Sequence, residues 1–299
     1  MTIKHLIISG GGPMGLRYLG ALQTLHNKNY WNIENIESIY STSIGSFIAT
    51  FFCLKYDYET LNNYIFNRPW YEAIKLTTNQ LLEAYYNKGL FDRKIVEIVF
   101  TPLFKAKDLN INITLHDFFI FCNIDLHIFS FDVNSFKTVE FSHTTHPNLE
   151  LIDAITMSST LPGLFIPNIK NGCCYIDGGV LCNYPINECI RDHPNEEECL
   201  GVNVCYVSSN ENSTINSIID ENSSLLDYII SISVNSMYYI RNSIKTHDIN
   251  NFICCNINFN PLTLEIIISI LKEKKNREEW FEQGVIDANL FLEKMNSNI

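Results

Sequence analysis

The first 55 or so residues contain one pattern twice: a short apolar run, a tight turn of small residues, and then apolar residues at helical spacing. In the first copy, His5–Ser9 leads into the glycine cluster Gly10–Gly15. In the second, a strand over 37–41 leads into Ser41–Gly45. Repeated strand–turn–helix units build a parallel sheet with helices on its faces. The pattern therefore predicts an α/β fold.

The remaining chain supplies further elements of both kinds. Turn residues between apolar runs predict an adjacent strand pair over 126–131 and 138–142, and further strands over 173–176, 201–207 and 252–257. Helical periodicity predicts helices near 153–159, 225–244 and 278–295, with a polar loop over 208–224 and a solvated lysine-rich helix face over 271–277. The expected architecture is a three-layer α/β sandwich with a mostly parallel central sheet.

Composition excludes several classes of protein. The 299 residues are 46% hydrophobic, which is typical of a globular core and not of a disordered chain. The 21 basic and 33 acidic residues give a net charge of −12, whereas a nucleic-acid binder needs a basic face. The same charge favours zwitterionic or neutral lipid surfaces over strongly anionic ones.

No signal peptide and no membrane-spanning stretch are indicated by the sequence. The ten cysteines contain no C-x-x-C pair, and the adjacent cysteines at 173–174 and 254–255 would point to opposite faces of a strand. We therefore expect reduced thiols that fill core space, and a cytoplasmic protein.

Gly10–Gly15 is the first of three turns that carry chemistry. Its backbone amides open a helix N-terminus, which is a ready site for an anion. The cluster also matches the dinucleotide fingerprint G-x-G-x-x-G, which needs an acidic residue at the end of the second strand. Glu34 and Glu37 have nearly the right spacing, but they precede or begin that strand, whereas Ser43 follows it. A nucleotide site is therefore an unfavoured alternative.

The second turn, Ser41–Gly45, is close to the nucleophile elbow G-x-S-x-G. In that elbow the central serine sits on a strained strand-to-helix turn, and small residues on either side relieve crowding. Ser43 takes the central place, and the amide of Ile44 lies where an oxyanion would form. Ser41 replaces the first glycine, so the turn must accommodate an additional side chain. Ordinary helix capping by these serines is the alternative interpretation.

The third turn is Asp177-Gly178-Gly179, which lies 134 residues after Ser43. Two glycines after an aspartate let the backbone turn sharply and leave the carboxylate uncovered. Each of the three turns follows a predicted strand, and the three in this order are a more specific signal than any one of them alone.

Taken together, the chain resembles the patatin-like phospholipases, which are lipid acyl hydrolases with a Ser–Asp dyad. Besides the three turns, Gly89–Asp92 resembles the G-L-F-D segment of the family. Residues 153–167 are similar to D-A-I-x-A-S-x-x-I-P-x-x-F-x-P, and residues 177–185 match D-G-G-x-x-x-N-x-P. The resemblance implies one domain over residues 1–299, with a motif-bearing core over about 4–206 and a last strand and helices over 225–299.

The resemblance also implies the roles of single residues. Ser43 would be the nucleophile and Asp177 its base, and an acyl-serine intermediate would form without a metal or cofactor. The expected oxyanion hole comprises the amides of Gly10, Gly11, Gly12 and Ile44, and the expected supporting glycines are Gly15, Gly45, Gly178 and Gly179. The substrate would be a carboxylic ester of a phospholipid or neutral lipid. The protein would have no nucleic-acid partner.

Two departures from the family pattern and several alternatives accompany this interpretation. Met14 stands where the family's glycine loop usually has a cation, which Arg17 could supply from the next helical turn, and Ser41 is the second departure. A catalytically degenerate lipid-binding relative is one alternative function, and a Ser–His–Asp triad is the rival mechanism. His143 and His146 lie in a polar loop, where we expect them to be solvated and uninvolved.

The segment between 56 and 92 is rich in aromatic residues, among them Trp70, Tyr85 and Tyr86. Such a segment can be a helical cap packed on the sheet, or a lip that meets a lipid surface. Peripheral contact with a membrane or lipid droplet is therefore a prediction.

Overall fold

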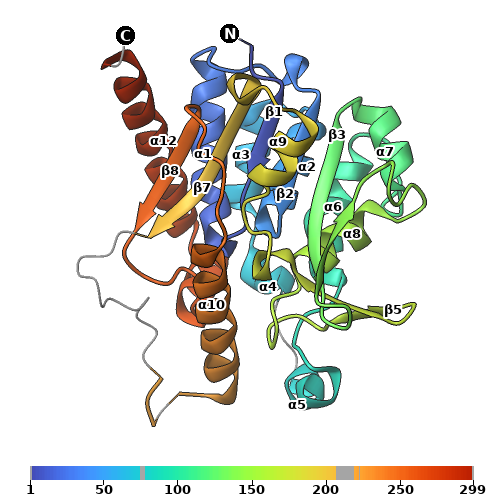
Figure 1. The fold of residues 1–299 in the computed structure, drawn as a ribbon. Helices are drawn as coiled ribbons and strands as arrows, with labels where there is room; N and C mark the ends of the chain where they lie inside the picture. Colours follow the sequence, from blue (N-terminus) through green and yellow to red (C-terminus); the bar gives the residue numbers. More distant parts are fainter. Residues whose placement is uncertain (1, 75–77, 207–218, 222, 298–299) are drawn as a thin grey trace.

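A mixed sheet runs through the computed structural model, which describes residues 2–74, 78–206, 219–221 and 223–297 (Figure 1). Its strands are β1 His5–Ile8, β2 Ser38–Thr42, β3 Asp125–Asp132, β4 Lys137–Phe141, β5 Asn168–Lys170, β6 Cys173–Asp177, β7 Cys199–Tyr206 and β8 Phe252–Ile257.

The strand order is β5-β6-β3-β2-β1-β7-β8, and β4 pairs with β3 outside this path. Strands β3, β2, β1, β7 and β8 run parallel to one another, whereas β4 and β6 lie antiparallel to β3 and β5 lies antiparallel to β6. The predicted α/β class with a mostly parallel centre is confirmed. The carboxyl ends of β1 and β2 consequently lie side by side, which brings the first two turns together.

The strands are connected by helices that cover the sheet (Figure 1). The α-helices are α1 Gly15–Asn27, α2 Ile44–Cys53, α3 Tyr58–Asn67, α4 Trp70–Ile74, α5 Thr78–Asn87, α6 Lys94–Lys105, α7 Leu115–Cys122, α8 Leu151–Ser158, α9 Ile186–Asp192, α10 Leu225–Ser243, α11 Leu264–Lys272 and α12 Lys274–Ser297. Short 3-10 helices are η1 Gly12–Met14, η2 Ile33–Asn35, η3 Gly178–Val180 and η4 Glu196–Glu198.

Alternate residues of each central strand enter different cores, as the two-residue period of a strand requires. On β1, Leu6 and Ile8 belong to a large core that also contains residues of α1, α2, α6 and α8. Ile7 points to the other face, where it packs with α9 residues such as Ile186 and Ile190. The layers of the sandwich are therefore unequal, with most helices on one face.

Helix α12 returns to the N-terminal part of the chain and packs along α1 (Figure 1). Arg17 of α1 binds Asp287 of α12 through two nitrogens, with Nε–Oδ2 at 2.9 Å and Nη2–Oδ2 at 2.6 Å. It also donates to the carbonyl oxygen of Asn256 on β8. Since a bidentate pair fixes the orientation of both side chains, this contact holds the C-terminal helix against the sheet.

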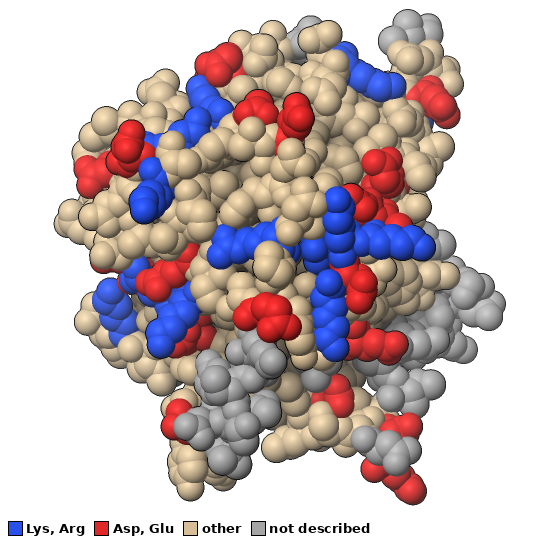
Figure 2. Space-filling model, turned by 180° about the vertical axis from the view of Figure 1, so that it is seen from behind, with Lys and Arg blue, Asp and Glu red and all other residues tan. Residues whose placement is uncertain are grey.

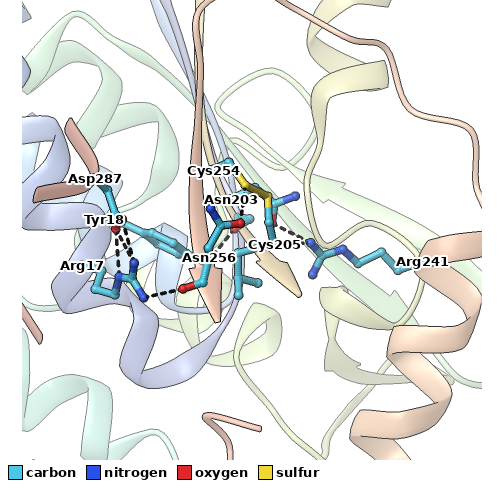
Figure 3. Close-up of a disulfide and its surroundings, with 10 residues drawn as sticks. Arg17, Tyr18, Asn203, Cys205, Arg241, Cys254, Asn256 and Asp287 are labelled. Carbon is cyan, nitrogen blue, oxygen red and sulfur yellow. Dashed lines mark hydrogen bonds and ion pairs between the residues drawn. A yellow bond between two sulfur atoms is a disulfide. The ribbon is translucent and has the colours of Figure 1, made fainter. Parts of the chain in front are cut away.

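The expectation that all thiols are reduced is wrong. Cys205 of β7 and Cys254 of β8 form a disulfide (Figure 3), and the other eight cysteines are free. The two strands run in parallel with Asn203 opposite Cys254 and Asn256 opposite Cys205, so the cysteines are diagonal neighbours. Sequence spacing does not reveal this pairing, because the register of β7 on β8 creates it. The cytoplasmic location, which rested partly on reduced thiols, stays a prediction.

Two other expectations can be compared with the structure. The polar loop predicted over 208–224 falls mostly outside the described residues. The segment 271–277 is not wholly a solvated face, because Arg277 is buried and donates to the carbonyl oxygens of Ile270 and Phe66. Arg277 thus satisfies carbonyls at the ends of α11 and α3.

Charges of both signs are spread over the face of the molecule that Figure 2 shows. Figure 2 shows Lys and Arg across the middle of one face, with Asp and Glu among them, and no single basic field. Among the described helices, none combines the length and the apolar character that a bilayer span requires.

Candidate active site

Ser43 occupies the sharp turn between β2 and α2. Its backbone has φ 52° and ψ −126°, a conformation that a residue with a Cβ rarely adopts. A side chain at Gly45 would overlap the carbonyl oxygen of Ile8, so this position accepts only glycine. The turn thus has the strained geometry expected of a nucleophile elbow.

Buried hydrogen bonds hold the turn in this conformation. The amide of Ser43 donates to Oγ of Ser158 at 2.8 Å, and this hydroxyl donates to the carbonyl oxygen of Phe129 on β3. Ser41, which replaces the elbow glycine, is fully buried and donates to the carbonyl oxygen of His127 at 3.2 Å. The extra hydroxyl is therefore satisfied within the sheet and does not displace Ser43.

Asp177 reaches Ser43 from the antiparallel part of the sheet. It ends β6 and pairs with Ser130 of β3, while Phe129, the neighbour of Ser130 on β3, pairs with Thr42 of β2. The two side chains meet with Ser43 Oγ 2.6 Å from Asp177 Oδ2. Two residues 134 positions apart in the sequence thus form a buried hydrogen-bonded pair.

The electrostatic environment of Asp177 suits a general base. Its carboxylate accepts from Ser43 at Oδ2 and from the amide of Gly179 at Oδ1, at 2.8 Å. Burial penalises the charged form and raises the pKa of Asp177 to about 6, although both hydrogen bonds act in the opposite direction. The carboxyl group is therefore mostly ionised at neutral pH and is far more basic than an exposed aspartate.

The glycine cluster brings backbone amides beside Ser43. Gly11 and Gly12 have φ values of 153° and 53°, which turn the loop after β1 into η1. Within the described residues, no hydrogen-bond acceptor is found for the amides of Gly11, Gly12 and Ile44. The amide of Gly10 differs, because it donates to the carbonyl oxygen of Asn183 at 3.0 Å. It is therefore engaged and does not point to an oxyanion.

The supporting glycines lie where backbone segments approach closely. A side chain at Gly15 would collide with Ile44, and one at Gly178 would overlap the carbonyl oxygen of Phe129. Gly179 lies close to Asp177, Asn183 and Met237. These contacts explain why small residues occupy all three positions.

Three further residues position the site, and sequence reasoning assigned them no such role. Tyr18 is fully buried and donates to the carbonyl oxygen of Gly10, with Ser9 as its second partner. Asn183 holds Gly10 from the other side, and Ser158 holds Ser43. Asn183 and Ser158 lie within the motifs that resemble the family, so that signal was present. Tyr18 had no signal beyond helical spacing.

A cavity of about 340 Å³ opens beside the Ser43–Asp177 pair. Its wall is almost entirely apolar, and its only charged lining residues among those described are Asp177, Arg241 and Arg277. The apolar lining comes from α1, α2, α4, α6, α10 and α11, and includes Leu19, Phe47, Trp70, Val99, Val234 and Ile267. Such a cavity suits a hydrocarbon chain.

None of the eight histidines lines this cavity. His127 and His143 lie instead near the amino end of β3, where both contact Asp125. His143 also stacks on Phe119, with ring centroids 3.8 Å apart, so the expectation that it is merely solvated is wrong. His146 packs against Phe141. A Ser–His–Asp arrangement is absent from the described part of the site.

The acidic residues that a nucleotide site would need are also misplaced. Glu37 directly precedes β2 and pairs with Lys4, which precedes β1. Glu34 pairs with Lys55 after α2. Glu37 thus lies at the amino end of the strands, whereas the glycine cluster follows the carboxyl end of β1. A bound ribose would lie beside the cluster.

Neither Met14 nor Arg17 provides a cation beside the glycine loop. Met14 is fully buried, and Arg17 is engaged with Asp287 and β8 rather than with the site. The proposal that Arg17 replaces the missing cation is therefore wrong. Among the described residues, no group of three or more His, Cys, Asp or Glu side chains is arranged to hold a metal ion.

Comparison with known proteins agrees with the fold and the motifs. The model of the family "Patatin-like phospholipase" matches residues 6–190. An uncharacterized protein of Acanthamoeba polyphaga mimivirus is 26% identical over 285 residues, covering 95% of this chain and 91% of the relative. A probable lipid hydrolase of Invertebrate iridescent virus 6 is 28% identical over 192 residues, covering 64% of each chain.

More distant relatives are longer than this chain. Lysophospholipase NTE1 of Candida albicans is 23% identical over 61% of this chain, which corresponds to 12% of its own length. The crystal structure of VipD from Legionella pneumophila matches 98% of this chain and 67% of VipD, with a TM-score of 0.55 and 16% identity, and so supports the fold.

The class defined by this fold and by the family match is that of the lipid ester hydrolases. The chain belongs to the patatin-like phospholipase family.

Proposed function

We propose that this protein is a lipid acyl hydrolase that cleaves carboxylic esters of phospholipids or neutral lipids through an acyl-serine intermediate on Ser43. The main support is the 2.6 Å contact between Ser43 Oγ and Asp177 Oδ2 on a strained elbow beside an apolar cavity. Backbone strain and perturbed pKa values both concentrate at functional sites, and here they occur at one buried pair.

In the proposed first step, Asp177 accepts the hydroxyl proton of Ser43 while Oγ attacks the ester carbonyl carbon. The carbonyl oxygen becomes an oxyanion, and the amides of Gly11, Gly12 and Ile44 stabilise it as donors that are already oriented. The carbon–oxygen bond to the alcohol then breaks, and Asp177 returns the proton to the departing oxygen. The products of this step are the free alcohol and an acyl ester on Ser43.

In the second step, water attacks the acyl ester and Asp177 accepts a proton from it. Collapse of the second tetrahedral intermediate releases the fatty acid, and the proton passes to Oγ, which restores Ser43. Both half-reactions use the same base and the same amides, and neither needs a histidine or a metal ion. The apolar cavity would hold the acyl chain throughout.

Steady-state hydrolysis of a p-nitrophenyl ester tests this proposal. We expect Ser43→Ala and Asp177→Asn each to reduce kcat/KM by about 10³-fold or more, since a nucleophile and its base act as a unit. Ser142→Ala is a matched control, because Ser142 is also a buried serine but contacts Thr144 and Thr145 instead of the site. Undiminished activity in either site variant would overturn the mechanism. Loss of activity with a chelator would contradict the absence of a metal.

We further propose that helices α5 and α10 contact a lipid surface. Both pack on one small apolar cluster, through Ala84 of α5 and Ile230 of α10, and both lie at the lower end of the molecule (Figure 1). Their outer sides expose large apolar residues: Tyr85, Tyr86, Leu225, Tyr228, Ile232 and Tyr239 are between 49% and 81% exposed.

A nearly neutral lipid surface is the occupant that these helices favour. Among their described side chains, Glu83, Asp227 and Arg241 are the charged ones, so an anionic bilayer gains little from them. Tyrosine is enriched where a protein meets the headgroup region. Replacing Tyr85, Tyr86 and Tyr228 by Ser should reduce co-sedimentation with phosphatidylcholine vesicles. Unchanged sedimentation, or much tighter binding of the wild type to anionic vesicles, would contradict this surface.

The lipid-binding but inactive relative is the remaining alternative. Such a protein would bind vesicles like the proposed hydrolase but would release no fatty acid. The raised pKa of Asp177 and the conformation of Ser43 favour the active enzyme, since a binding role requires neither.

A further inference from the structure

Ser159 lines the cavity beside the Ser43–Asp177 pair, and the mechanism above does not use it. Its side chain is buried, and no described residue forms a hydrogen bond with its Oγ. In the family pattern that residues 153–167 resemble, Ser158 takes the serine position, whereas 159 has no fixed residue type. A buried hydroxyl without a partner costs free energy, so packing of the fold gives no reason for it.

The residues on either side of Ser159 are bonded to the proposed nucleophile and to its base. Ser158 Oγ accepts a hydrogen bond from the amide of Ser43 at 2.8 Å. The carbonyl oxygen of Thr160 accepts one from the amide of Asp177 at 2.9 Å. Since adjacent Cα atoms are only about 3.8 Å apart, Ser159 lies one residue away from a contact with each member of the pair.

Ser159 lies on the side of Ser43 that faces away from the glycine cluster. The strand order β6-β3-β2-β1 places β3 and β6 on one side of β2, and β1 on the other. The turn that contains Ser159 is bonded to β3 at Phe129 and to β6 at Asp177, whereas the glycine cluster follows β1. Ser159 therefore borders the base and not the amides that would bind the oxyanion.

Among the described side chains that line the cavity, Arg277 is the other one with a buried polar atom that lacks a partner, its Nε. The rest of that guanidinium is engaged, because it donates to the carbonyl oxygens of Ile270 and Phe66, where α11 and α3 end. Arg277 thus has a structural explanation. Ser159 has none, and it lies beside the reacting groups.

A water molecule that enters this largely apolar cavity needs polar partners, since a buried water typically makes about three hydrogen bonds. In the acyl-enzyme, Oγ of Ser43 carries the acyl group and has no hydrogen to donate. Asp177 Oδ2 then loses its donor and is free to accept a hydrogen bond from water. The hydroxyl of Ser159 supplies a second partner on the same side of Ser43.

We propose that Ser159 is a further catalytic residue, whose hydroxyl holds the water that attacks the acyl ester on Ser43. One hydrogen of this water passes to Asp177, and Ser159 Oγ accepts a hydrogen bond from the other. A lone pair of the water oxygen forms the new bond to the acyl carbon. Collapse of the tetrahedral intermediate then breaks the bond to Ser43 Oγ, which takes the proton from Asp177. This inference rests on the proposed hydrolase function and adds a residue to its second step.

Pre-steady-state hydrolysis of p-nitrophenyl octanoate separates the two steps, because acylation releases p-nitrophenol whereas deacylation removes the acyl group from Ser43. In Ser159→Ala we expect acylation within about twofold of the wild type and decay of acyl-Ser43 about tenfold slower, since one hydrogen bond has roughly that effect. Mass spectrometry of quenched samples follows acyl-Ser43. Ser142→Ala, the variant of a buried serine outside the site, should change neither rate.

The variants Ser159→Thr and Ser159→Val form a matched pair, because their side chains have nearly the same shape and differ in the hydroxyl. Deacylation should be about tenfold faster in Ser159→Thr than in Ser159→Val. Equal deacylation rates in this pair would overturn the proposal, since the hydroxyl would then have no effect.

Urea unfolding separates a catalytic hydroxyl from a structural one. Ser159→Ala should be at least as stable as the wild type, because its Oγ has no partner to lose. Ser158→Ala, by contrast, loses buried hydrogen bonds to Ser43 and Phe129 and should be less stable. A Ser159→Ala protein that unfolds, or that is less stable than the wild type, would overturn the proposal, because the hydroxyl would then be bonded within the fold.

Each other kinetic outcome has a definite meaning. Equal losses in acylation and deacylation would assign Ser159 a structural role, unchanged rates would assign it none, and a loss in acylation alone would place its hydroxyl at the departing alcohol. All three overturn the proposal. A wild type that releases no p-nitrophenol and forms no acyl-Ser43 would overturn the proposed function itself, and the water site with it.

Discussion

The two ends of the central strands carry polar clusters of opposite character. Near the amino end of β3, His127 lies between Asp125 and Glu140, with nitrogen–oxygen distances of 3.2 and 2.7 Å, and stacks on Tyr40. At the other end, Ser43 and Asp177 form a buried hydrogen-bonded pair, with Ser43 on a strained turn. No described residue accepts a hydrogen bond from the neighbouring amides of Gly11, Gly12 and Ile44.

The pKa shifts express this difference. Two carboxylates raise the pKa of His127 to about 9, although burial acts against them, so the charged form is the stabilised one. Burial raises the pKa of Asp177 to about 6, so there the charged form is destabilised. The amino-end cluster thus stabilises the fold, and the carboxyl-end pair maintains a reactive group at the expense of stability.

The largest effect on stability is expected at the amino end. A histidine whose pKa is 6.5 when unfolded and about 9 when folded stabilises the protein fully below pH 6.5, and this contribution disappears as the pH rises through 9. The loss amounts to about 3 kcal/mol. Urea unfolding between pH 6 and 10 should show this loss as a fall in the free energy of unfolding with rising pH. The slope of the free energy of unfolding against pH should vanish in His127→Gln. A slope that persists in the variant would show that other groups cause it.

At the carboxyl end, by contrast, removing the ionisable group is expected to raise the stability of the protein. Asp177→Asn removes a buried charge and should stabilise the protein at pH 7 by roughly 1–3 kcal/mol, the upper value corresponding to the pKa rise from 3.8 to about 6. Urea unfolding of the wild type and the variant at pH 7 measures this directly. At pH 4 the difference should shrink, because the wild-type carboxyl group is then protonated. A variant less stable than the wild type at pH 7 would contradict the comparison.

The smallest effect is the pH dependence of turnover. If ionised Asp177 is the base, kcat/KM should fall about tenfold per pH unit below pH 6 and level off above it. His127→Gln should leave this profile unchanged, since His127 is remote from the cavity. If kcat/KM instead falls only below about pH 4, where an unperturbed carboxyl group titrates, this would argue against Asp177 as the base.

Much of the fold and the site could be predicted because their signals are local. The strand over 252–257 matches β8, and the helix over 225–244 matches α10 within one residue. The spacing of Ser43 and Asp177 alone does not predict that they are in contact. The resemblance to a known family predicts the contact, and the antiparallel pairing of β6 with β3 produces it in the fold.

The failures involve contacts between segments distant in sequence. The disulfide of Cys205 and Cys254 depends on the register of β7 and β8, and the role of Arg17 depends on α12 lying along α1. Gly10 belongs to the expected glycine motif, yet its amide is taken by Asn183 from a loop 173 residues away. Such pairings follow from tertiary packing, which no local pattern encodes.

Reaction of the protein with a fluorophosphonate, followed by mass spectrometry to locate the adduct, most directly tests whether Ser43 is an activated nucleophile. We expect one adduct, on Ser43, that is absent in Ser43→Ala and strongly reduced in Asp177→Asn. A folded wild-type protein that stays unlabelled, or that carries its adduct on another residue, would contradict it.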